Sequence, residues 1–509
     1  MILSLLASLH LFAESPDKAP EKTPEAAIAF EAKGDKALTG WDMTERAPVV
    51  TKHKITLGGK EIDYIATAGR LPIKDKLGNI EAQMFYVAYT LPGQEPGKRP
   101  ITFAFNGGPG ASTVWLHLGA LGPRKAQFTA EGWRPAAPYR LVDNPDCPLL
   151  DTDIVLIDAI GSGWSRPADA EKGRKFWNLQ GDIASFGSFI TTYLTRNQRW
   201  SSPLFLFGES YGSTRAAGLS SHLSDRGITF NGITLMGPVL DLASVYAWGT
   251  NDAPFPGSIP SFHSVAAYHK KLAPELLKDP AASRAEVEKW VVDTYIPALA
   301  KGDAMKPEER RQLIHDLARY IGLNEDLIDR ENLRISTHVF TSHLLDQERL
   351  LVGRFDGRYK GADPSGKRES GSDPSFTAVV PVFASCLNDY MQRELKFHTE
   401  LPYALFAHES GAFNWDWGQG GGFAETASDL SSAMVRNPHL KVLVMEGHYD
   451  LATPYFAAET SLQRLNLNPQ QRQRIQSARY DSGHMLYLHQ PSLEKMNRDY
   501  HDFLKLAAP

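Results

Sequence analysis

Five short apolar segments, each closed by a glycine or a polar turn, constrain the fold of this chain more than any other feature. They are residues 101–105, 153–157, 204–207, 232–236 and 441–445. Strands that are apolar on both faces belong in a mainly parallel sheet covered by helices on both sides. Apolar residues at helical spacing, such as Phe186, Ile190 and Tyr193, lie between these segments. The alternation therefore predicts an open α/β sheet.

The pattern also predicts how the 509 residues are organised. Residues 62–66 and 82–91 alternate between apolar and polar side chains, which is typical of antiparallel strands. From 241 to 440 the strand pattern stops and helical patterns follow, at 274–277, 286–299 and 307–321. We therefore predict a helical lid at 241–440, inserted into an α/β core formed by residues 41–240 and 441–509. Without the lid about 300 residues of the chain remain, a size that a single α/β core can reach.

Residues 1–40 are expected to precede the folded core. Residues 2–13 are almost wholly apolar and then give way to charged residues and prolines. This pattern fits a signal peptide at 1–13, although no Lys or Arg precedes the apolar run, and the run is too short to cross a bilayer. Residues 14–40 are predicted to be a linker. We expect a secreted or periplasmic protein without a stable membrane anchor.

Charge and composition exclude several classes of function. The chain has 54 Lys and Arg against 59 Asp and Glu and no long basic stripe, so a nucleic-acid partner is not expected. The two cysteines, Cys147 and Cys386, allow at most one disulfide, and we interpret both as buried structural residues. The histidines lack metal-ligand spacing and the glycines at 418–422 do not follow a strand, so neither a metal nor another cofactor is expected.

The run G-E-S-Y-G at residues 208–212 points to a nucleophile. With 41 glycines in the chain, a bare G-x-S-x-G arises easily by chance, so its setting carries the argument. It follows the apolar segment 204–207 and precedes a helical pattern, which is the nucleophile elbow of an α/β-hydrolase. A Cβ at Gly208 or Gly212 would crowd such a sharp turn. Ser210 is therefore predicted to be the nucleophile, at the carboxyl end of the sheet.

A serine hydroxyl needs a base to take its proton, and the base is usually a histidine oriented by an acid. In this fold the chain order is serine, acid, histidine. Asp450 stands a few residues after the segment 441–445, and His484 follows an expected strand at 475–480, with Gly483 allowing a tight turn. We prefer Asp450 and His484 for these roles. On spacing alone, the alternatives Glu446, His448, Asp481 and His489 stay open.

The tetrahedral intermediate needs hydrogen-bond donors for its oxyanion, usually two backbone N–H groups. The glycine-rich run N-G-G-P-G at 106–110 directly follows the first core strand, where it would let backbone amides approach a ligand closely. We predict that the oxyanion hole is formed by the N–H groups of Gly108 and Tyr211. The alternative is an ordinary flexible turn.

On these segments the chain resembles the serine carboxypeptidase family, in a bacterial form. The segments that carry the resemblance are 106–110, D-A-I-G-S-G-W-S at 158–165, 208–212, G-H-Y-D at 447–450 and G-H-M at 483–485. The resemblance implies an α/β-hydrolase that releases the C-terminal residue of peptides, with Ser210, Asp450 and His484 as its triad. It also implies that Asn106, Gly107 and Glu209 bind the C-terminal carboxylate of the substrate. Two carboxylates side by side must share a proton, so such peptides should bind better below neutral pH.

Two departures from the family pattern qualify this resemblance. The family usually has Cys where this chain has Ala111, so one of the usual disulfides is absent. A second carboxylate-binding Glu usually precedes a Gly-Pro pair, but here Ala120 and Leu121 precede that pair. His117 or a residue of the lid could replace it. An esterase or acyltransferase on the same scaffold, and a catalytically silent binding protein, stay open as alternatives.

Overall fold

The computed structural model describes residues 41–363, 373–410, 413–418 and 423–508. The predicted signal peptide at 1–13 and linker at 14–40 lie outside these residues. Over the described ranges, no helix combines the length and the apolar character needed to span a bilayer.

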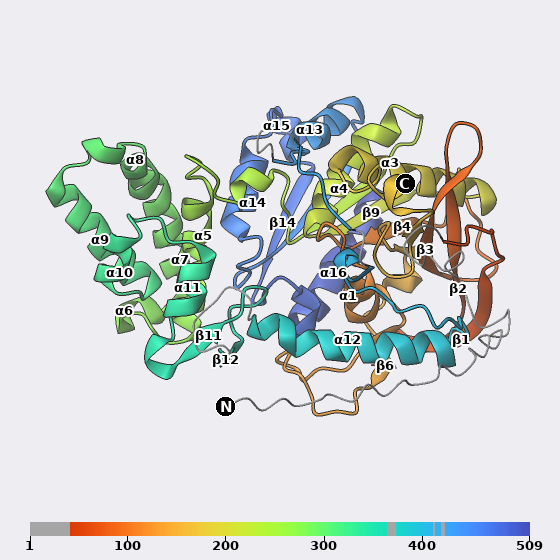
Figure 1. Ribbon diagram of the computed structural model, residues 1–509, viewed down its shortest axis with the longest axis horizontal. Coiled ribbons are helices and arrows are strands. Elements are labelled where there is room, and N and C mark those ends of the chain that lie inside the picture. Colours follow the sequence, from red (N-terminus) through yellow and green to blue (C-terminus); the bar gives the residue numbers. More distant parts are fainter. Residues whose placement is uncertain (1–40, 364–372, 411–412, 419–422, 509) are drawn as a thin grey trace, which may run out of the picture.

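Strands form the centre of the molecule (Figure 1). They are β1 (Val49–Leu57), β2 (Lys60–Lys74), β3 (Ile80–Thr90), β4 (Ile101–Phe105), β5 (Arg124–Ala126), β6 (Leu141–Asp143), β7 (Asp153–Ile157), β8 (Arg166–Pro167), β9 (Leu204–Glu209), β10 (Gly232–Met236), β11 (Leu350–Val352), β12 (Lys360–Ala362), β13 (Lys441–Gly447) and β14 (Ile475–Tyr480).

The main sheet has ten strands within the described part of the chain. Nine follow the order β1-β2-β3-β7-β4-β9-β10-β13-β14, and the short β8 pairs with β3. The pairs from β1 to β7 are antiparallel, and those from β7 to β14 are parallel. The sheet is thus mainly parallel with an antiparallel edge. The prediction of an α/β-hydrolase fold is confirmed.

Helices alternate with these strands and also fill the long segment between β10 and β13. They are α1 (Val114–Leu116), α2 (Ala170–Gly173), α3 (Leu179–Arg196), α4 (Tyr211–Ser224), α5 (Pro254–Tyr268), α6 (Pro274–Leu277), α7 (Pro280–Trp290), α8 (Ile296–Leu299), α9 (Pro307–Ile321), α10 (Glu325–Arg330), α11 (Thr337–His343), α12 (Pro374–Arg393), α13 (Ala427–Arg436), α14 (Tyr455–Gln463), α15 (Pro469–Arg472) and α16 (Gln490–Ala507).

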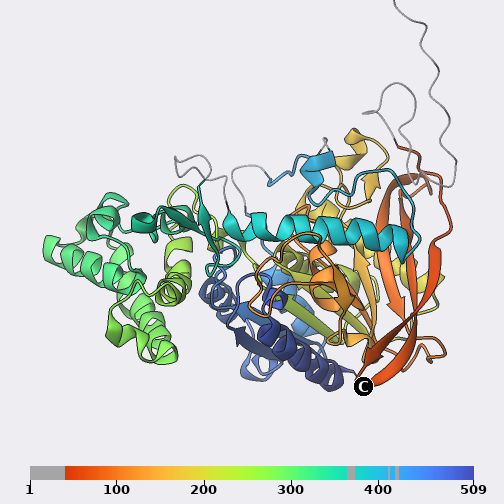
Figure 2. The same cartoon turned by 90° about the horizontal axis from the view of Figure 1, so that it is seen from below.

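Both faces of the main sheet are covered by helices (Figures 1 and 2). On one face, α3, α4 and α13 bury apolar side chains such as Phe186, Leu219 and Leu430 against the strands. On the other face, α12 and α16 bury Phe383 and Phe503. Two apolar cores therefore enclose the parallel strands, which is why these strands are apolar on both sides.

The segment between β10 and β13 is mostly helical but divides into two parts. Helices α5 to α11 form a cluster with its own apolar core, seen at the left of Figure 1, in which Phe262 stacks on Phe340 with ring centroids 4.1 Å apart. In contrast, α12 lies along the main sheet and packs into its core. A short antiparallel hairpin, β11 and β12, also occurs here, although the sequence predicted no strand in this segment. Strands of three residues are too short to produce a recognisable alternation.

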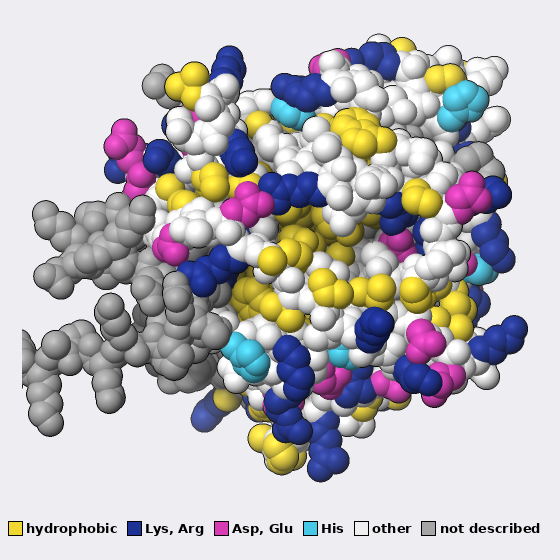
Figure 3. Space-filling view, turned by 90° about the vertical axis from the view of Figure 1, so that its right-hand side faces the viewer, with side chains coloured by type: hydrophobic (Ala, Val, Ile, Leu, Met, Phe, Trp, Pro, Cys, Tyr) yellow, Lys and Arg dark blue, Asp and Glu magenta, His cyan; other side chains and the backbone are white. Residues whose placement is uncertain are grey.

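Both cysteines are buried and neither is in a disulfide, which confirms their interpretation as buried structural residues. On the face shown in Figure 3, positive and negative side chains are interspersed around apolar side chains that gather across the middle of the view. Because the two cysteines form no disulfide, the fold is stabilised by its apolar cores and not by a cross-link.

Candidate active site

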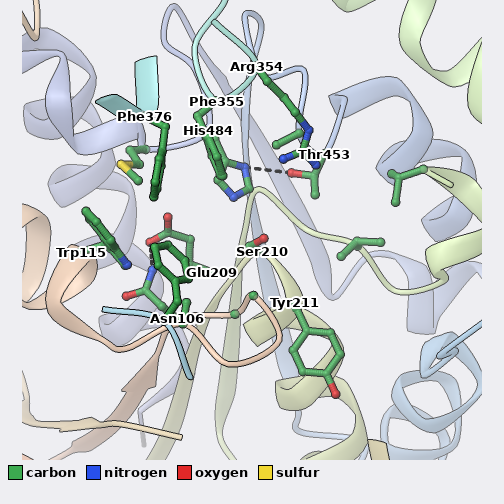
Figure 4. Close-up of a pocket in the computed structure, with 18 of the residues that line it drawn as sticks. Asn106, Trp115, Glu209, Ser210, Tyr211, Arg354, Phe355, Phe376, Thr453 and His484 are labelled. Atoms are coloured by element: carbon green, nitrogen blue, oxygen red, sulfur yellow. Dashed lines mark hydrogen bonds between the residues drawn. The ribbon is translucent and has the colours of Figure 1, made fainter. Parts of the chain in front are cut away.

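Ser210 lies at the tip of the turn between β9 and α4. Its backbone has φ 63° and ψ −131°, a conformation that side-chain-bearing residues rarely adopt and that costs free energy. Backbone hydrogen bonds hold it: Ser210 N–H donates to Met236 O at 2.9 Å, and Ser213 N–H donates to Ser210 O at 2.8 Å. The turn presents the Ser210 side chain to a pocket at the carboxyl end of the sheet (Figure 4).

The glycines beside Ser210 are required by close backbone approach. A Cβ on Gly208 would lie 2.1 Å from Gly212 O, and a Cβ on Gly212 would lie 2.7 Å from Phe105 O. Both distances are far inside van der Waals contact with backbone atoms, which cannot move aside cheaply. A side chain at either position would therefore crowd the turn, as expected from the sequence.

His484 and Asp450 meet behind Ser210. His484 Nδ1 lies 2.7 Å from Asp450 Oδ2, and both side chains are buried. Asp450 Oδ1 accepts the backbone N–H groups of Ala452 at 2.8 Å and Thr453 at 2.9 Å, which fixes the orientation of the carboxylate. His484 lines the same pocket as Ser210. The structure thus brings together the three residues predicted as the triad.

The other candidates for the acid and the base have different surroundings. His448 Nδ1 lies 2.9 Å from Asp481 Oδ1, and His489 Nδ1 lies 2.8 Å from Ser492 Oγ. Glu446 is buried, and burial raises its pKa well above the ordinary value, further helped by the charge of Glu459. None of these four candidates, Glu446, His448, Asp481 and His489, lines the pocket that contains Ser210.

The electrostatics of the site favour a protonated His484. Burial alone lowers the pKa of this imidazole, but the charge and hydrogen bond of Asp450, together with the charge of Glu209, outweigh it and raise the pKa above its ordinary value. A raised pKa means that the imidazolium is stabilised where it forms. His484 can therefore accept a proton from Ser210 and hold it.

Two contacts of His484 were not foreseen from the sequence. The Thr453 hydroxyl lies 2.8 Å from Asp450 Oδ2 and 3.1 Å from His484 Nδ1. The backbone N–H of His484 donates to Phe355 O at 2.6 Å. No motif marks either contact, because Thr453 is an ordinary loop residue and Phe355 lies more than a hundred residues earlier in the chain.

The glycine-rich loop at 106–110 lies against the start of α4. A Cβ on Gly107 would lie only 2.4 Å from Tyr211 N, so the two segments are in close contact. Tyr211 is the first residue of α4, and its N–H has no acceptor within the helix. Gly107, Gly108 and Tyr211 all line the pocket with Ser210. Both predicted oxyanion donors therefore lie at the nucleophile.

This loop is held by buried polar residues. Arg215 Nη1 donates to Asn106 O at 2.6 Å, and Arg215 is itself paired with Asp182 at 2.8 Å. Asp158 accepts the backbone N–H of Thr113 at 2.7 Å from the other side. The segment 158–165 therefore holds the residues that directly follow the loop at 106–110 and does not line the pocket.

Glu209 stands beside the nucleophile, 2% exposed, and lines the pocket. Asn106 Nδ2 donates to Glu209 Oε2 at 2.7 Å, and the Tyr487 hydroxyl donates to the same oxygen at 3.1 Å. Asn106 is fixed in turn, because its Oδ1 accepts the backbone N–H of Leu116 at 3.0 Å. Asn106, Gly107 and Glu209, predicted to bind a substrate carboxylate, thus form one wall of the pocket. Tyr487 was missed because nothing in its local sequence marks it.

The pKa of Glu209 is close to neutrality. Burial raises it to about 7, against the charge of His484 and the hydrogen bonds from Asn106 and Tyr487, which lower it. The carboxyl is thus poised to carry a proton at neutral and acidic pH. A protonated Glu209 could donate a hydrogen bond to an anionic group in the pocket.

No carboxylate occupies the position where the family has its second carboxylate-binding Glu. Ala120 is buried and lies outside the pocket. His117, one of the two suggested replacements, also lies outside it: its Nε2 is 2.6 Å from the Tyr89 hydroxyl, and burial lowers its pKa to about 3. Several residues of the segment 241–440 do reach the pocket, and Arg354 is the cationic one among them.

The remaining lining of the pocket is largely apolar. It includes Trp115, Phe355, Phe376, Phe406 and Met485 together with Val239, Leu242, Val245 and Tyr246. Across the described ranges, no group of three or more His, Cys, Asp or Glu side chains is placed to hold a metal ion. The arrangement of Ser210, His484 and Asp450 can support attack of a serine on an acyl group.

The chain is similar to several solved structures and to one family model. A comparison with curated protein sequences finds no match. Among solved structures, the chain is similar to Kex1(Δ)p, a prohormone-processing carboxypeptidase from Saccharomyces cerevisiae, at 14% identity and a TM-score of 0.49, covering 87% of this chain and 91% of that one. It is also similar to proline iminopeptidase from Mycobacterium smegmatis, at 13% identity and a TM-score of 0.37, covering 87% and 98%. The family model described as serine carboxypeptidase matches residues 67–279, which contain the loop at 106–110 and Ser210.

Proposed function

We propose that this protein is a serine carboxypeptidase, which releases the C-terminal residue of peptides through an acyl-enzyme. The observation that carries the proposal is Glu209: a buried carboxyl with a pKa of about 7 lies next to the nucleophile, in the pocket shared by Ser210 and His484. A general esterase has no use for such a group. A carboxypeptidase needs it to recognise the free carboxylate that defines its substrates. The family match over residues 67–279 supports the same assignment.

In the proposed reaction, Ser210 Oγ attacks the carbonyl carbon of the last peptide bond and His484 takes its proton. Asp450, 2.7 Å from Nδ1 of the imidazole, orients His484 and stabilises its charge. The N–H groups of Gly108 and Tyr211 stabilise the oxyanion. His484 then gives its proton to the leaving amine, and a water molecule activated by His484 hydrolyses the acyl-enzyme.

Recognition of the substrate terminus falls to Asn106, Gly107 and Glu209. A protonated Glu209 donates a hydrogen bond to the substrate carboxylate, so that the two groups share one proton. When Glu209 ionises, the two negative charges repel each other in a buried site. Binding of peptides with a free C-terminus should therefore weaken as the pH rises through about 7, the pKa of Glu209. Activity on such peptides that rises steadily to high pH would contradict the proposal.

We further propose that the segment 241–440 is a lid that shapes the pocket. Seven pocket residues come from it: Leu242, Val245, Tyr246, Arg354, Phe355, Phe376 and Phe406. Most of them are apolar, so the lid would bury the side chains of a peptide and exclude water from the acyl-enzyme.

One observation favours a second candidate, an esterase or acyltransferase. Ala120 stands where the family has a carboxylate-binding Glu, so one of the two usual contacts to the substrate carboxylate is missing. An ester substrate needs neither. A catalytically silent binding protein is less favoured, because the Ser210, Asp450 and His484 side chains are all retained in a connected site.

The test compares three substrates across pH 4 to 8: an N-blocked dipeptide, its C-terminal amide, and the p-nitrophenyl ester of an N-blocked amino acid. We expect kcat/KM for the free dipeptide to exceed that for the amide at acidic pH, and the preference to shrink as Glu209 ionises. Ser210→Ala should abolish turnover of all three substrates. Rapid ester turnover with no preference for the free dipeptide would favour the esterase instead. Failure of the protein to react with a serine-directed phosphonate would favour the silent binding protein.

A further inference from the structure

Arg354 is a cationic side chain at the pocket with no role in the reaction described above. It follows β11 in the chain, is half-buried, and lines the pocket together with Ser210 and His484. Its backbone is held on both sides, because Arg354 N–H donates to Asp373 Oδ1 at 3.1 Å and Arg354 O accepts Leu451 N–H at 3.1 Å. The guanidinium is 5.4 Å from the centroid of the Phe355 ring. The side chain is thus placed by its surroundings.

Within the described part of the chain, no carboxylate forms an ion pair with the Arg354 guanidinium. The one carboxylic acid among the described residues that line the pocket is Glu209, and it already accepts hydrogen bonds from Asn106 and Tyr487. A half-buried guanidinium facing a ligand pocket without a partner favours an anionic ligand group.

Arg354 and the carboxylate-binding residues lie on opposite sides of the nucleophile. In Figure 4, Asn106 and Glu209 lie to one side of Ser210 and His484, whereas Arg354 extends toward Thr453 on the other side, which it shares with Tyr211. With the substrate carboxylate at Asn106 and Glu209, the attacked carbonyl is at Ser210. The residue that supplies this carbonyl must then extend toward Arg354.

Apart from Thr453, this side of the pocket has an apolar wall. Tyr211, Val239 and Leu242 form a buried cluster against which Val245 packs, and all four line the pocket. Such a wall accommodates methylene groups, and the charged side chain of Arg354 lines the same pocket. A side chain with a short aliphatic stem and a carboxylate at its end matches both features.

We propose that Arg354 makes the enzyme selective for peptides whose penultimate residue is Glu or Asp. The guanidinium pairs with the side-chain carboxylate of that residue in a geometry that allows two parallel hydrogen bonds. A Lys or Arg at the same substrate position is disfavoured by like charge. This inference rests on the proposed function for the orientation of the peptide. The selectivity itself concerns only the acyl group, so it also applies to ester substrates.

The test measures kcat/KM for pairs of substrates that differ only in the acyl residue: N-blocked Glu-Leu, Gln-Leu and Lys-Leu, and the p-nitrophenyl esters of N-blocked Glu and Gln. Gln is the neutral counterpart of Glu with the same shape. A charge-assisted hydrogen bond contributes on the order of 1.5–3 kcal/mol, so we expect Glu to be preferred over Gln by about tenfold or more. The pH is held at 6, where the substrate Glu is ionised.

Variants of Arg354 separate its charge from its bulk. Arg354→Gln should bring the ratio of kcat/KM for the Glu substrate to that for the Gln substrate close to one, and Arg354→Lys should retain part of the preference. Arg354→Glu should reverse it, so that the substrate with Lys as its penultimate residue is preferred. The matched control is Arg330→Gln, which makes the same change at an exposed position on α10, outside the pocket. The control should keep the preference of the unmodified enzyme. Because each measurement is a ratio within one protein, a partial loss of folded enzyme does not alter it.

Each outcome decides the inference. A Glu-to-Gln ratio near one in the unmodified enzyme, or the same ratio in Arg354→Gln, would overturn it. An equal loss on all dipeptides but none on the esters would mean that Arg354 binds the C-terminal carboxylate instead, which also overturns it. Turnover of the esters alone would refute the carboxypeptidase assignment, while the Glu-to-Gln ester ratio would still decide the role of Arg354. Turnover of neither substrate type would refute both proposals.

Discussion

Glu209 combines a buried position with a titratable charge, and this combination should be visible in the stability of the protein. In the folded chain its pKa is about 7, against an ordinary value of 4.5. Between these two values the folded state binds a proton that the unfolded state does not. The stabilisation from Glu209 is therefore fully present below about pH 4.5 and is lost as the pH rises through about 7.

Glu209→Gln should remove this dependence, because an amide does not titrate. From the difference between the two pKa values, the free energy of unfolding of Glu209→Gln relative to the unmodified protein should rise by about 3 kcal/mol between pH 4 and pH 8. Chemical denaturation of both proteins at the two pH values measures this difference, and other titrating groups cancel in the comparison. A difference that is the same at both pH values would show that Glu209 has an ordinary pKa.

The assignment of Asp450 as the acid can be tested against a matched carboxylate. Asp450→Asn keeps the size of the side chain but removes the charge that holds His484 in the correct tautomer, so kcat should fall by about 10⁴-fold on the best substrate. Asp481→Asn makes the same change at the carboxylate that pairs with His448, outside the pocket, and should leave kcat within a few-fold. Equal losses in the two variants would remove Asp450 from its proposed role.

At the scale of secondary structure, the buried strands were predictable almost residue by residue. The segments 101–105, 153–157 and 232–236 coincide with β4, β7 and β10, in which every residue is buried, so composition alone marks their ends. In contrast, β9 and β13 each run two residues further, into Glu209 and Gly447. These residues continue the strand through backbone hydrogen bonds, and a pattern of apolar side chains does not reveal such bonds.

Contacts between distant elements could not be predicted from local patterns. The triad residues stand at strand ends in a fixed chain order, which is why Ser210, Asp450 and His484 were candidates from the sequence. Tyr487 donates to Glu209 across 278 residues of sequence, and Arg354 enters the pocket from a segment whose hairpin was not predicted. Such side chains have no periodicity or motif of their own. Their roles depend on packing that only the three-dimensional structure provides.

At the scale of the whole molecule, the pocket is assembled from four separate stretches of chain. They are residues 106–115, 209–211 and 452–485, and, counted together because both lie largely in the segment between β10 and β13, residues 239–246 and 354–406. The first three belong to the predicted core, whereas the fourth belongs almost wholly to the segment 241–440. In the proposed function, the catalytic groups thus come from the ends of the sheet strands, and most of the surface available to a substrate side chain comes from the segment 241–440. This division allows selectivity to change without disturbing the triad.

The stability of the protein should not change when a reductant is added. Cys147 and Cys386 are both buried and free, so no intrachain disulfide contributes to stability. A disulfide that closes a long loop typically stabilises a protein by 2–4 kcal/mol, and its reduction would lower the thermal midpoint measurably. We expect the same midpoint of thermal unfolding with and without dithiothreitol. In denaturant without reductant, two thiols per chain should react with a thiol reagent. In the native state both thiols should react slowly, because they are buried. No titratable thiol in denaturant, together with a lower midpoint in dithiothreitol, would mean that the two cysteines pair. The stability would then depend on a cross-link as well as on the two apolar cores that enclose the sheet.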